Sequence, residues 1–146
     1  MHTGKTIQEI SLGEKATFAK TITEVDIWAF AAISGDFNPV HVDEEYAKET
    51  FFKKRVAHGP VAMSLLAPVL GMMLPGPGTV ALDCYTRFAA PVYPRDTIRV
   101  TAEVSELDIE RNICTLRCEW RNQESRLVME GWVKVMPPRK KRQTGD

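Results

Sequence analysis

An acid and a histidine lie close together in the segment SGDFNPVH, residues 34–41. Asp36 carries a carboxylate, and His41, later in the same segment, carries an imidazole. These two groups can hold one water molecule between them and share the proton transfers that add or remove water. Gly35 and the Asn-Pro pair that follows it argue against a regular helix, so we expect a loop. Taken singly, Asp36 could serve an Asx-turn and His41 could be an ordinary imidazole.

A second chemical feature follows in AHGPVAMSLLAPVLGMMLPGPG. Pro60 suits the first position of a helix, and the PGPG at 75–78 stops it, so we expect an apolar helix over residues 60–75. The start of a helix presents free N–H groups and a partial positive charge. Gly59 stands there, and its lack of a side chain lets a carbonyl group approach closely. We expect the ring of His58 to cap or brace the loop.

The segments ISGDFNPVHVDEEYA and VAHGPVAMSLL together resemble the signature of MaoC-like dehydratases, the (R)-specific enoyl-CoA hydratases. The likeness covers roughly residues 12–136. It implies hydration of a trans-2-enoyl-CoA to an (R)-3-hydroxyacyl-CoA, or the reverse, on an acyl-CoA substrate without a metal or another cofactor. Carried over by position, Asp36 and His41 are the catalytic pair and the Gly59 N–H binds the thioester carbonyl. Which of the pair takes the proton from water stays open.

The elements around these residues predict the fold class. A strand is expected within residues 11–22, an amphipathic helix capped by Thr23 comes next, and a short helix begins at Asp43. From Thr79 onward the hydrophobic pattern has a period of two and predicts four strands, at 79–93, 97–107, 112–122 and 126–137. We expect an antiparallel meander with the apolar helix buried against one face, surrounded by protein.

This arrangement is an α+β fold of the hot-dog type, an antiparallel sheet wrapped around one central helix. We expect one domain over residues 1–137 and a basic tail over residues 138–146. A single sheet wrapped on one helix leaves an edge strand open, which favours a homodimer or a higher homo-oligomer.

Composition narrows the class of protein. The 19 basic and 19 acidic residues cancel, which gives no reason to expect nucleic-acid binding. The apolar run at residues 60–75 is short for a bilayer and contains a proline, and the N-terminus lacks an apolar leader, so we expect no membrane role and a cytoplasmic location. Cys84, Cys114 and Cys118 are an odd set, and the last two are too far apart in one strand for a disulfide, so we expect reduced thiols.

Several residues are candidates for binding the acyl chain or the CoA phosphates of the substrate. Asn38, Ser64 and Leu65 are candidate substrate-binding residues. Relatives in the resembling family often carry a hydroxyl residue near position 67 and glycine at position 95, where this chain has Ala67 and Arg95. We expect Pro68 to kink the central helix and reshape the acyl tunnel, and Arg95 to adopt a positive φ if the turn type is kept. The candidates for binding the CoA phosphates are Lys53, Lys54, Arg55 and Arg87.

Two other functions remain open. Hot-dog proteins include thioesterases, although residues 60–75 contain no Asp or Glu, which counts against an acid on the central helix. A non-catalytic acyl-CoA-binding subunit would bind the thioester without turnover. Release of free CoA thiol would identify the thioesterase, and the effect of substituting Asp36 would distinguish an enzyme from a binding subunit.

Overall fold

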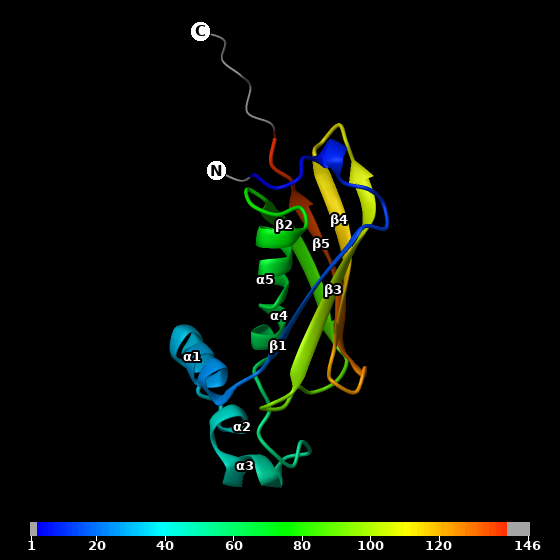
Figure 1. Cartoon of the computed structure of the whole chain (residues 1–146). Coiled ribbons are helices and arrows are strands. Elements are labelled where there is room, and N and C mark those ends of the chain that lie inside the picture. Colours follow the sequence, from blue (N-terminus) through cyan, green and yellow to red (C-terminus); the bar gives the residue numbers. More distant parts are fainter. Residues whose placement is uncertain (1–2, 140–146) are drawn as a thin grey trace.

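The computed structural model describes residues 3–139 of the 146-residue chain. A curved antiparallel sheet holds a central helical segment on its concave side (Figure 1). Its strands are β1 (Lys15–Thr21), β2 (Val80–Phe88), β3 (Thr97–Asp108), β4 (Ile113–Arg121) and β5 (Leu127–Met136). The helices are η1 (Ile7–Glu9), α1 (Glu24–Ser34), α2 (Pro39–Val42), α3 (Glu44–Glu49), α4 (Gly59–Met63), α5 (Leu66–Pro68) and η2 (Val69–Met73). This is the hot-dog arrangement, and the predicted α+β fold class is confirmed.

The order of the strands in the sheet is β1-β3-β4-β5-β2. The predicted meander is correct for β3, β4 and β5, which pair with their neighbours in sequence. It is wrong for β2, which pairs with β5 at the far edge, while β3 pairs with β1. Alternating hydrophobicity identifies a strand but not its partner. Residues 89–96 carry the chain from one edge of the sheet to β3, so the bend expected there is a crossing between non-neighbouring strands.

The core lies between the sheet and the central segment. Alternate residues of β3 and β4 are buried, as the period of two predicts. The central segment contributes a matching apolar side, with Val61, Ala62, Leu65, Leu66 and Val69 buried. Burying a large aliphatic side chain contributes about 1.5–3 kcal/mol, so this contact fixes where residues 59–73 lie.

The central segment is interrupted, as Pro68 predicted. Because Pro68 has no N–H, the Ser64 carbonyl accepts instead from the Ala67 N–H at 3.0 Å. The stretch after Pro68 is a π-helical turn, closed by the Leu74 N–H on the Val69 carbonyl at 2.8 Å, and it ends at Met73 rather than at residue 75. The predicted interruption is confirmed, and the central helix covers residues 59–73 as the three short elements α4, α5 and η2 instead of residues 60–75.

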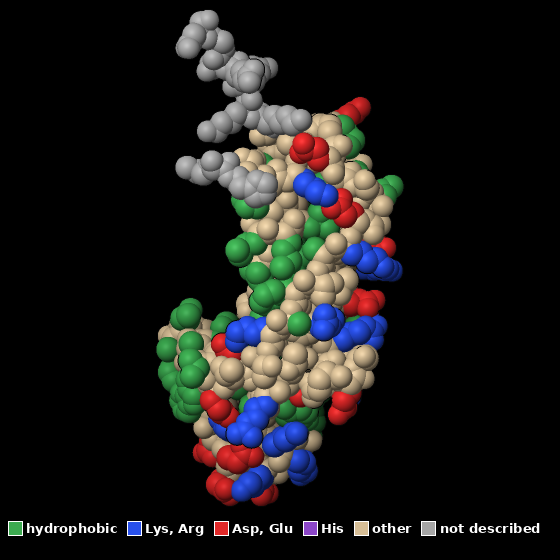
Figure 2. Space-filling view, viewed as in Figure 1, with side chains coloured by type: hydrophobic (Ala, Val, Ile, Leu, Met, Phe, Trp, Pro, Cys, Tyr) green, Lys and Arg blue, Asp and Glu red, His purple; other side chains and the backbone are tan. Residues whose placement is uncertain are grey.

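The prediction that protein surrounds the central segment is wrong for one protomer. Ser64, Ala67, Gly71 and Met72 are exposed, because a single sheet covers only one side of the segment. Figure 2 shows hydrophobic side chains beside this segment on the molecular surface. An apolar stripe therefore remains outside the core.

Helix α1 stands away from the sheet (Figure 1). Thr23 caps it, with the Asp26 N–H bound to the Thr23 hydroxyl, and Gly35 ends it in the left-handed conformation at φ 78°. Ile27 and Ala31 are buried, but Ile33 is 84% exposed, so the apolar face predicted for this helix is only partly covered. Only one side of α1 reaches the body of the protein. Hydrophobic side chains also gather over α1 in Figure 2.

Smaller predictions concern the thiols, the turn at Arg95 and the termini. The three cysteines are free, and burial raises the pKa of Cys114 to about 11 and that of Cys118 to about 12, so both thiols stay protonated at neutral pH. Arg95 has a φ of 75°, a conformation that costs a residue with a side chain roughly 1–2 kcal/mol. Within residues 3–139, no helix is long and apolar enough to span a membrane. Residues 140–146 of the predicted basic tail lie outside the described residues.

Alanine at position 131 is expected to destabilise the fold. Its Cβ would lie 1.9 Å from the Tyr85 carbonyl oxygen, which belongs to the β2 backbone and can retreat only if the β2–β5 ladder opens. We expect Gly131→Ala to lower the free energy of unfolding by about 3 kcal/mol, measured by urea denaturation with tryptophan fluorescence. Glu106→Ala, an exposed change on β3, should alter it by less than about 0.5 kcal/mol. Equal effects of the two variants would contradict the close approach of β2 to Gly131.

Candidate active site

Asp36 follows Gly35, the residue that ends α1. Its two carboxylate oxygens make different contacts. Its Oδ1 accepts the Asn38 N–H at 3.1 Å, which is the Asx-turn expected from the sequence. Its backbone N–H donates to the Ser34 hydroxyl at 3.1 Å. The other carboxylate oxygen, Oδ2, faces two imidazoles, and the side chain is 50% exposed. The structural and the catalytic interpretations of Asp36 are therefore compatible, because each uses a different oxygen.

His41 lies on a one-turn helix rather than on the predicted loop. Pro39 occupies the first turn of α2, and the Asn38 side chain caps it by accepting the Val40 N–H at 3.3 Å. A proline at the start and an asparagine cap are both favourable for a helix start, which the loop prediction overlooked. The turn directs the mostly buried His41 ring toward Asp36, and its Nε2 lies 3.9 Å from Asp36 Oδ2.

A backbone contact orients the His41 ring. Its Nδ1 lies 2.8 Å from the Val56 carbonyl oxygen, an acceptor, so the neutral ring carries its proton on Nδ1. This tautomer leaves the Nε2 lone pair facing the Asp36 carboxylate. The Val56 N–H in turn donates to the Val40 carbonyl at 3.2 Å, so both backbone groups of Val56 hold α2.

His58 braces the loop, as predicted. It is 1% exposed, and its Nε2 lies 2.9 Å from the Asp36 carbonyl oxygen. Its ring stacks on the His41 ring, with centroids 3.8 Å apart, and contacts Phe30 on α1 at a centroid distance of 4.9 Å. His58 therefore contacts both members of the predicted catalytic pair.

Gly59 is the first residue of α4. Pro60 has no N–H, and the Val61 N–H donates to the His58 carbonyl at 3.0 Å, so the Gly59 N–H is the group left to face outward at the helix start. A Cβ on Gly59 would lie 2.4 Å from the Phe88 ring, so only glycine fits here without moving that ring. Glycine is therefore required here by the contact with Phe88, and the predicted binding of a carbonyl by the Gly59 N–H stays a prediction.

An apolar pocket of about 560 Å³ adjoins these groups. His41, Asn38 and Gly59 line it, while Asp36 is not part of the lining and reaches it only through the neighbouring His41. The remaining walls are apolar and come from several elements: Val40, Phe52, Val56, Ala57, Pro60, Ala62, Phe88, Ala89, Ala90, Pro91, Val92, Val128 and Met129. A few polar groups at one end of an apolar hollow are typical of a site for a small ligand with an apolar tail.

Ser64 and Leu65 do not join this pocket. They line a separate hollow between the central segment and α1, and the Ser64 hydroxyl donates to the Val61 carbonyl at 2.7 Å. Pro68 lines neither hollow. Substrate binding by Ser64 and Leu65, and an effect of Pro68 on the acyl tunnel, therefore remain predictions without support from the geometry.

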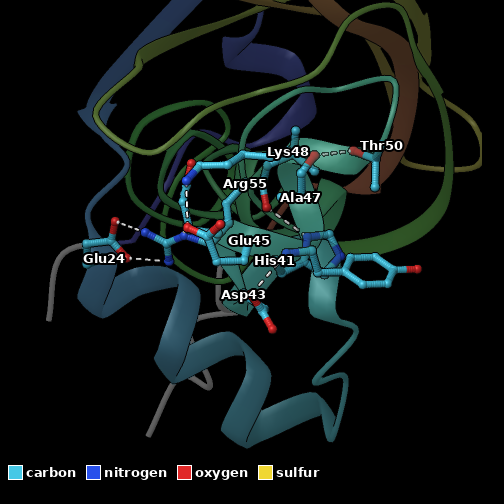
Figure 3. Close-up of polar contacts among 11 residues, drawn as sticks. Glu24, His41, Asp43, Glu45, Ala47, Lys48, Thr50 and Arg55 are labelled. Atoms are coloured by element: carbon cyan, nitrogen blue, oxygen red, sulfur yellow. Dashed lines mark hydrogen bonds and ion pairs between the residues drawn. The ribbon is translucent and has the colours of Figure 1, made fainter.

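Arg55 joins α1 to α3, the helices on either side of the segment that carries Asp36 and His41 (Figure 3). Its guanidinium binds Glu24 of α1 at 2.7 and 3.0 Å and Glu44 of α3 at 3.0 Å. Donating hydrogen bonds to the Glu24 carboxylate, and also to that of Glu44, raises the pKa of Arg55. Arg55 is thus engaged in fixing α1 against α3 rather than free to bind phosphate.

The other candidate cations differ in their surroundings. Arg87 pairs with Glu130 across β2 and β5. Lys54 lies over the Tyr93 ring, with its Nζ 4.0 Å from the ring centroid. Lys53 is exposed and has a φ of 63°. Lys53 and Lys54 are therefore the two candidates that no carboxylate neutralises among the described contacts.

Asp36, His41 and His58 offer ligand atoms within 4.8 Å of one another, close enough to consider a metal. The hydrogen bond to the Asp36 carbonyl requires that His58 Nε2 carry a proton, so this atom has no lone pair to donate to a metal. The cluster is better suited to moving protons than to holding an ion.

Two contributors to the site escaped the sequence analysis. The Val56 carbonyl orients His41, and the Phe88 ring covers Gly59. Val56 acts through its backbone, which any residue could supply, and Phe88 is an ordinary apolar position in a strand pattern. Neither leaves a local signal in the sequence.

The chain is similar to known proteins in both sequence and fold. The MaoC like domain family matches residues 8–125. An (R)-specific enoyl-CoA hydratase from Rhodospirillum rubrum is 41% identical over 131 residues, 90% of each chain, and a 3-hydroxybutyryl-CoA dehydratase from Methylorubrum extorquens is 37% identical over 91% of this chain and 84% of its own. The unliganded R-hydratase of Pseudomonas aeruginosa superposes with a TM-score of 0.88 at 37% identity, covering 94% of this chain and 88% of its own. This chain belongs to the MaoC-like dehydratase family.

Proposed function

We propose that this protein adds water to trans-2-enoyl-CoA thioesters to form (R)-3-hydroxyacyl-CoA and catalyses the reverse dehydration. The observation that carries the proposal is the placement of Asp36 Oδ2 3.9 Å from His41 Nε2, beside a helix start at Gly59. The names of the similar hydratase and dehydratase support the same chemistry.

The geometry suits each step of the reaction. A water molecule between the Asp36 carboxylate and the His41 lone pair loses one proton to this pair as its oxygen bonds to C3 of the substrate. The electrons of the C2–C3 double bond move toward the thioester carbonyl, whose oxygen becomes negative. The Gly59 N–H donates to that oxygen, an interaction worth on the order of 3 kcal/mol of barrier. A proton from the pair then adds to C2, so no cofactor is consumed.

The pocket and its surroundings suit an acyl-CoA thioester. The apolar walls next to His41 and Gly59 would hold the acyl chain, and Asn38 lines the polar end. Lys53 and Lys54, which precede the helix start, remain the candidates for the CoA phosphates.

The alternative functions have less support. The central segment at residues 59–73 contains no Asp or Glu, which counts against a thioesterase with its acid there. A binding subunit would not need the tautomer that leaves the His41 lone pair facing a carboxylate.

The proposal also includes a reducing, cytoplasmic location, supported by the three free thiols.

A second copy of the chain is part of the same proposal. Strand β2 forms one edge of the sheet and is exposed along nearly its whole length. Its exposed large apolar side chains are Val80, Leu82, Tyr85 and Phe88. An open apolar edge invites pairing with a second sheet, and the exposed stripe of the central segment would be covered by the same contact. We therefore propose a homodimer that pairs through β2.

Substitution of either member of the pair should abolish hydration. Asp36→Asn removes the negative charge with little change of shape, and His41→Ala removes the lone pair. We expect each to lower kcat on crotonyl-CoA by about 10³-fold, followed by loss of the enoyl-thioester absorbance. Asp43→Asn, a change in the cap of the neighbouring α3, is the matched control and should keep activity within a few fold. Wild-type protein that releases free CoA thiol instead of hydrating would favour the thioesterase.

Alanine at position 59 should impair the reaction more than the fold. The new Cβ would push the exposed Phe88 ring away and stand where the thioester carbonyl must approach. We expect kcat/KM to fall about 100-fold for Gly59→Ala, with a much smaller change in Tm. Phe88→Ala alone should lower kcat/KM less than Gly59→Ala does. The comparison separates the effect of displacing the ring from the effect of blocking the Gly59 N–H. Activity within twofold of wild type in Gly59→Ala would rule out its N–H as the carbonyl donor.

The dimer can be tested at the β2 edge. Leu82→Glu places a charge on the exposed edge, and Ile109→Glu places the same charge on the exposed turn between β3 and β4. Light scattering after size-exclusion chromatography should give twice the 16.4 kDa chain mass for wild type and Ile109→Glu, and a shift toward the monomer for Leu82→Glu. A dimer unaffected by Leu82→Glu would place the contact elsewhere.

A further inference from the structure

We infer that His58 is a positioning residue that sets the geometry of both Asp36 and His41 relative to the Gly59 N–H. The inference rests on the proposed function, since it concerns the same site, and it begins with the burial of His58. The ring is 1% exposed and lies between the Phe30 ring and the His41 ring. A buried polar side chain normally makes a hydrogen bond, and the one that His58 makes is with the Asp36 backbone.

The hydrogen bond of His58 fixes its tautomer. A backbone carbonyl only accepts, so Nε2, 2.9 Å from the Asp36 carbonyl oxygen, carries the proton. The other ring nitrogen, Nδ1, is buried and has no hydrogen-bond partner among the described residues. The neutral ring with its proton on Nε2 is therefore the form that satisfies the site, because a proton on Nδ1 would have no acceptor.

This bond ties the catalytic loop to the body of the protein. Among the described residues, every other hydrogen bond made by residues 35–38 stays within residues 31–41. The bond from His58 is the one that reaches outside this local segment. Without it, the described hydrogen bonds of residues 35–38 would all be local.

The ring face of His58 positions the other catalytic group. The His41 and His58 centroids lie 3.8 Å apart with the planes inclined by 30°, so His58 limits the tilt of His41. The Val56 carbonyl fixes one ring nitrogen of His41, and the stack fixes its plane. Because His58 directly precedes Gly59 in the chain, one residue sets the distance from the proton-transferring pair to the helix start.

Three substitutions of His58 separate the effect of its hydrogen bond to Asp36 from the effect of its stacking on His41. His58→Gln keeps an N–H donor at a similar reach, His58→Phe keeps a ring to stack but has no donor, and His58→Ala keeps neither. A misplacement of about 1 Å can cost 100-fold in rate. We expect His58→Phe to lose about 100-fold in kcat on crotonyl-CoA with KM changed less than threefold, and His58→Gln to retain at least ten times the kcat of His58→Phe. His58→Ala should be the least active.

A control separates positioning from stability. Thr6 is another buried polar residue, and its hydroxyl binds Glu9 at 2.9 Å in η1, outside the site. Thr6→Val should lower Tm while leaving kcat unchanged. The inference would be overturned if His58→Phe and His58→Gln lost the same activity, if all three variants kept kcat within twofold, or if kcat fell only in proportion to the folded fraction.

Nuclear magnetic resonance tests the inference independently of turnover. The chain has 3 histidines, so ring signals labelled with nitrogen-15 are few. We expect a protected Nε2–H signal that disappears in His58→Phe, together with shifts of the His41 ring and the Asp36 amide in His58→Ala. A wild type that hydrates no enoyl-CoA would overturn the proposed function, while these signals would still decide whether His58 holds the pair. A proton found on Nδ1 would overturn the inference.

Discussion

The packing of the apolar central segment against the concave face of the sheet is the constraint on which the site depends. Residues 59–73 carry five of the buried side chains named above, and the alternating residues of β3 and β4 provide the opposing surface. This contact fixes the position of the helix start. Because the segment begins at Gly59, the same contact places an N–H donor at the end of the apolar pocket.

The four residues from Val56 to Gly59 convert this packing into a site. Val56 holds α2 through both of its backbone groups, and the Ala57 N–H donates to the Val92 carbonyl at 2.8 Å. His58 contacts both Asp36 and His41, and Gly59 presents its N–H. These four consecutive residues thus bind separate parts of the protein. Their order explains how an exposed loop after α1 is held against the core.

The same fold leaves part of its apolar surface uncovered. One sheet covers one side of the central segment, while the edge strand β2 and one side of α1 remain exposed. The apolar composition of the central segment led to the expectation of complete burial, which is incorrect within one protomer. Hydrophobicity reports that a surface needs a partner, but it does not tell whether the partner belongs to the same chain.

The sequence by itself determined the elements and the chemical groups. Period-two alternation identified four strands, the Thr23 and Gly35 caps bounded α1, and the spacing of Asp36, His41 and Gly59 indicated the chemistry. These features are local, since strand alternation, caps and loop residues depend on neighbours in the chain. The interruption before Pro68 was predictable for the same reason, because a missing N–H acts within one helical turn.

Only the tertiary structure decided how these parts meet. The pairing of β2 with β5, the Val56 carbonyl that selects the His41 tautomer and the stacking of His58 on His41 join residues that are distant in the chain. Backbone carbonyls carry no sequence signal, and alternation does not specify a strand partner. The substrate-binding roles predicted for Ser64 and Leu65 illustrate the limit, because helical spacing could not tell that these residues face a hollow beside α1 instead of the pocket beside His41.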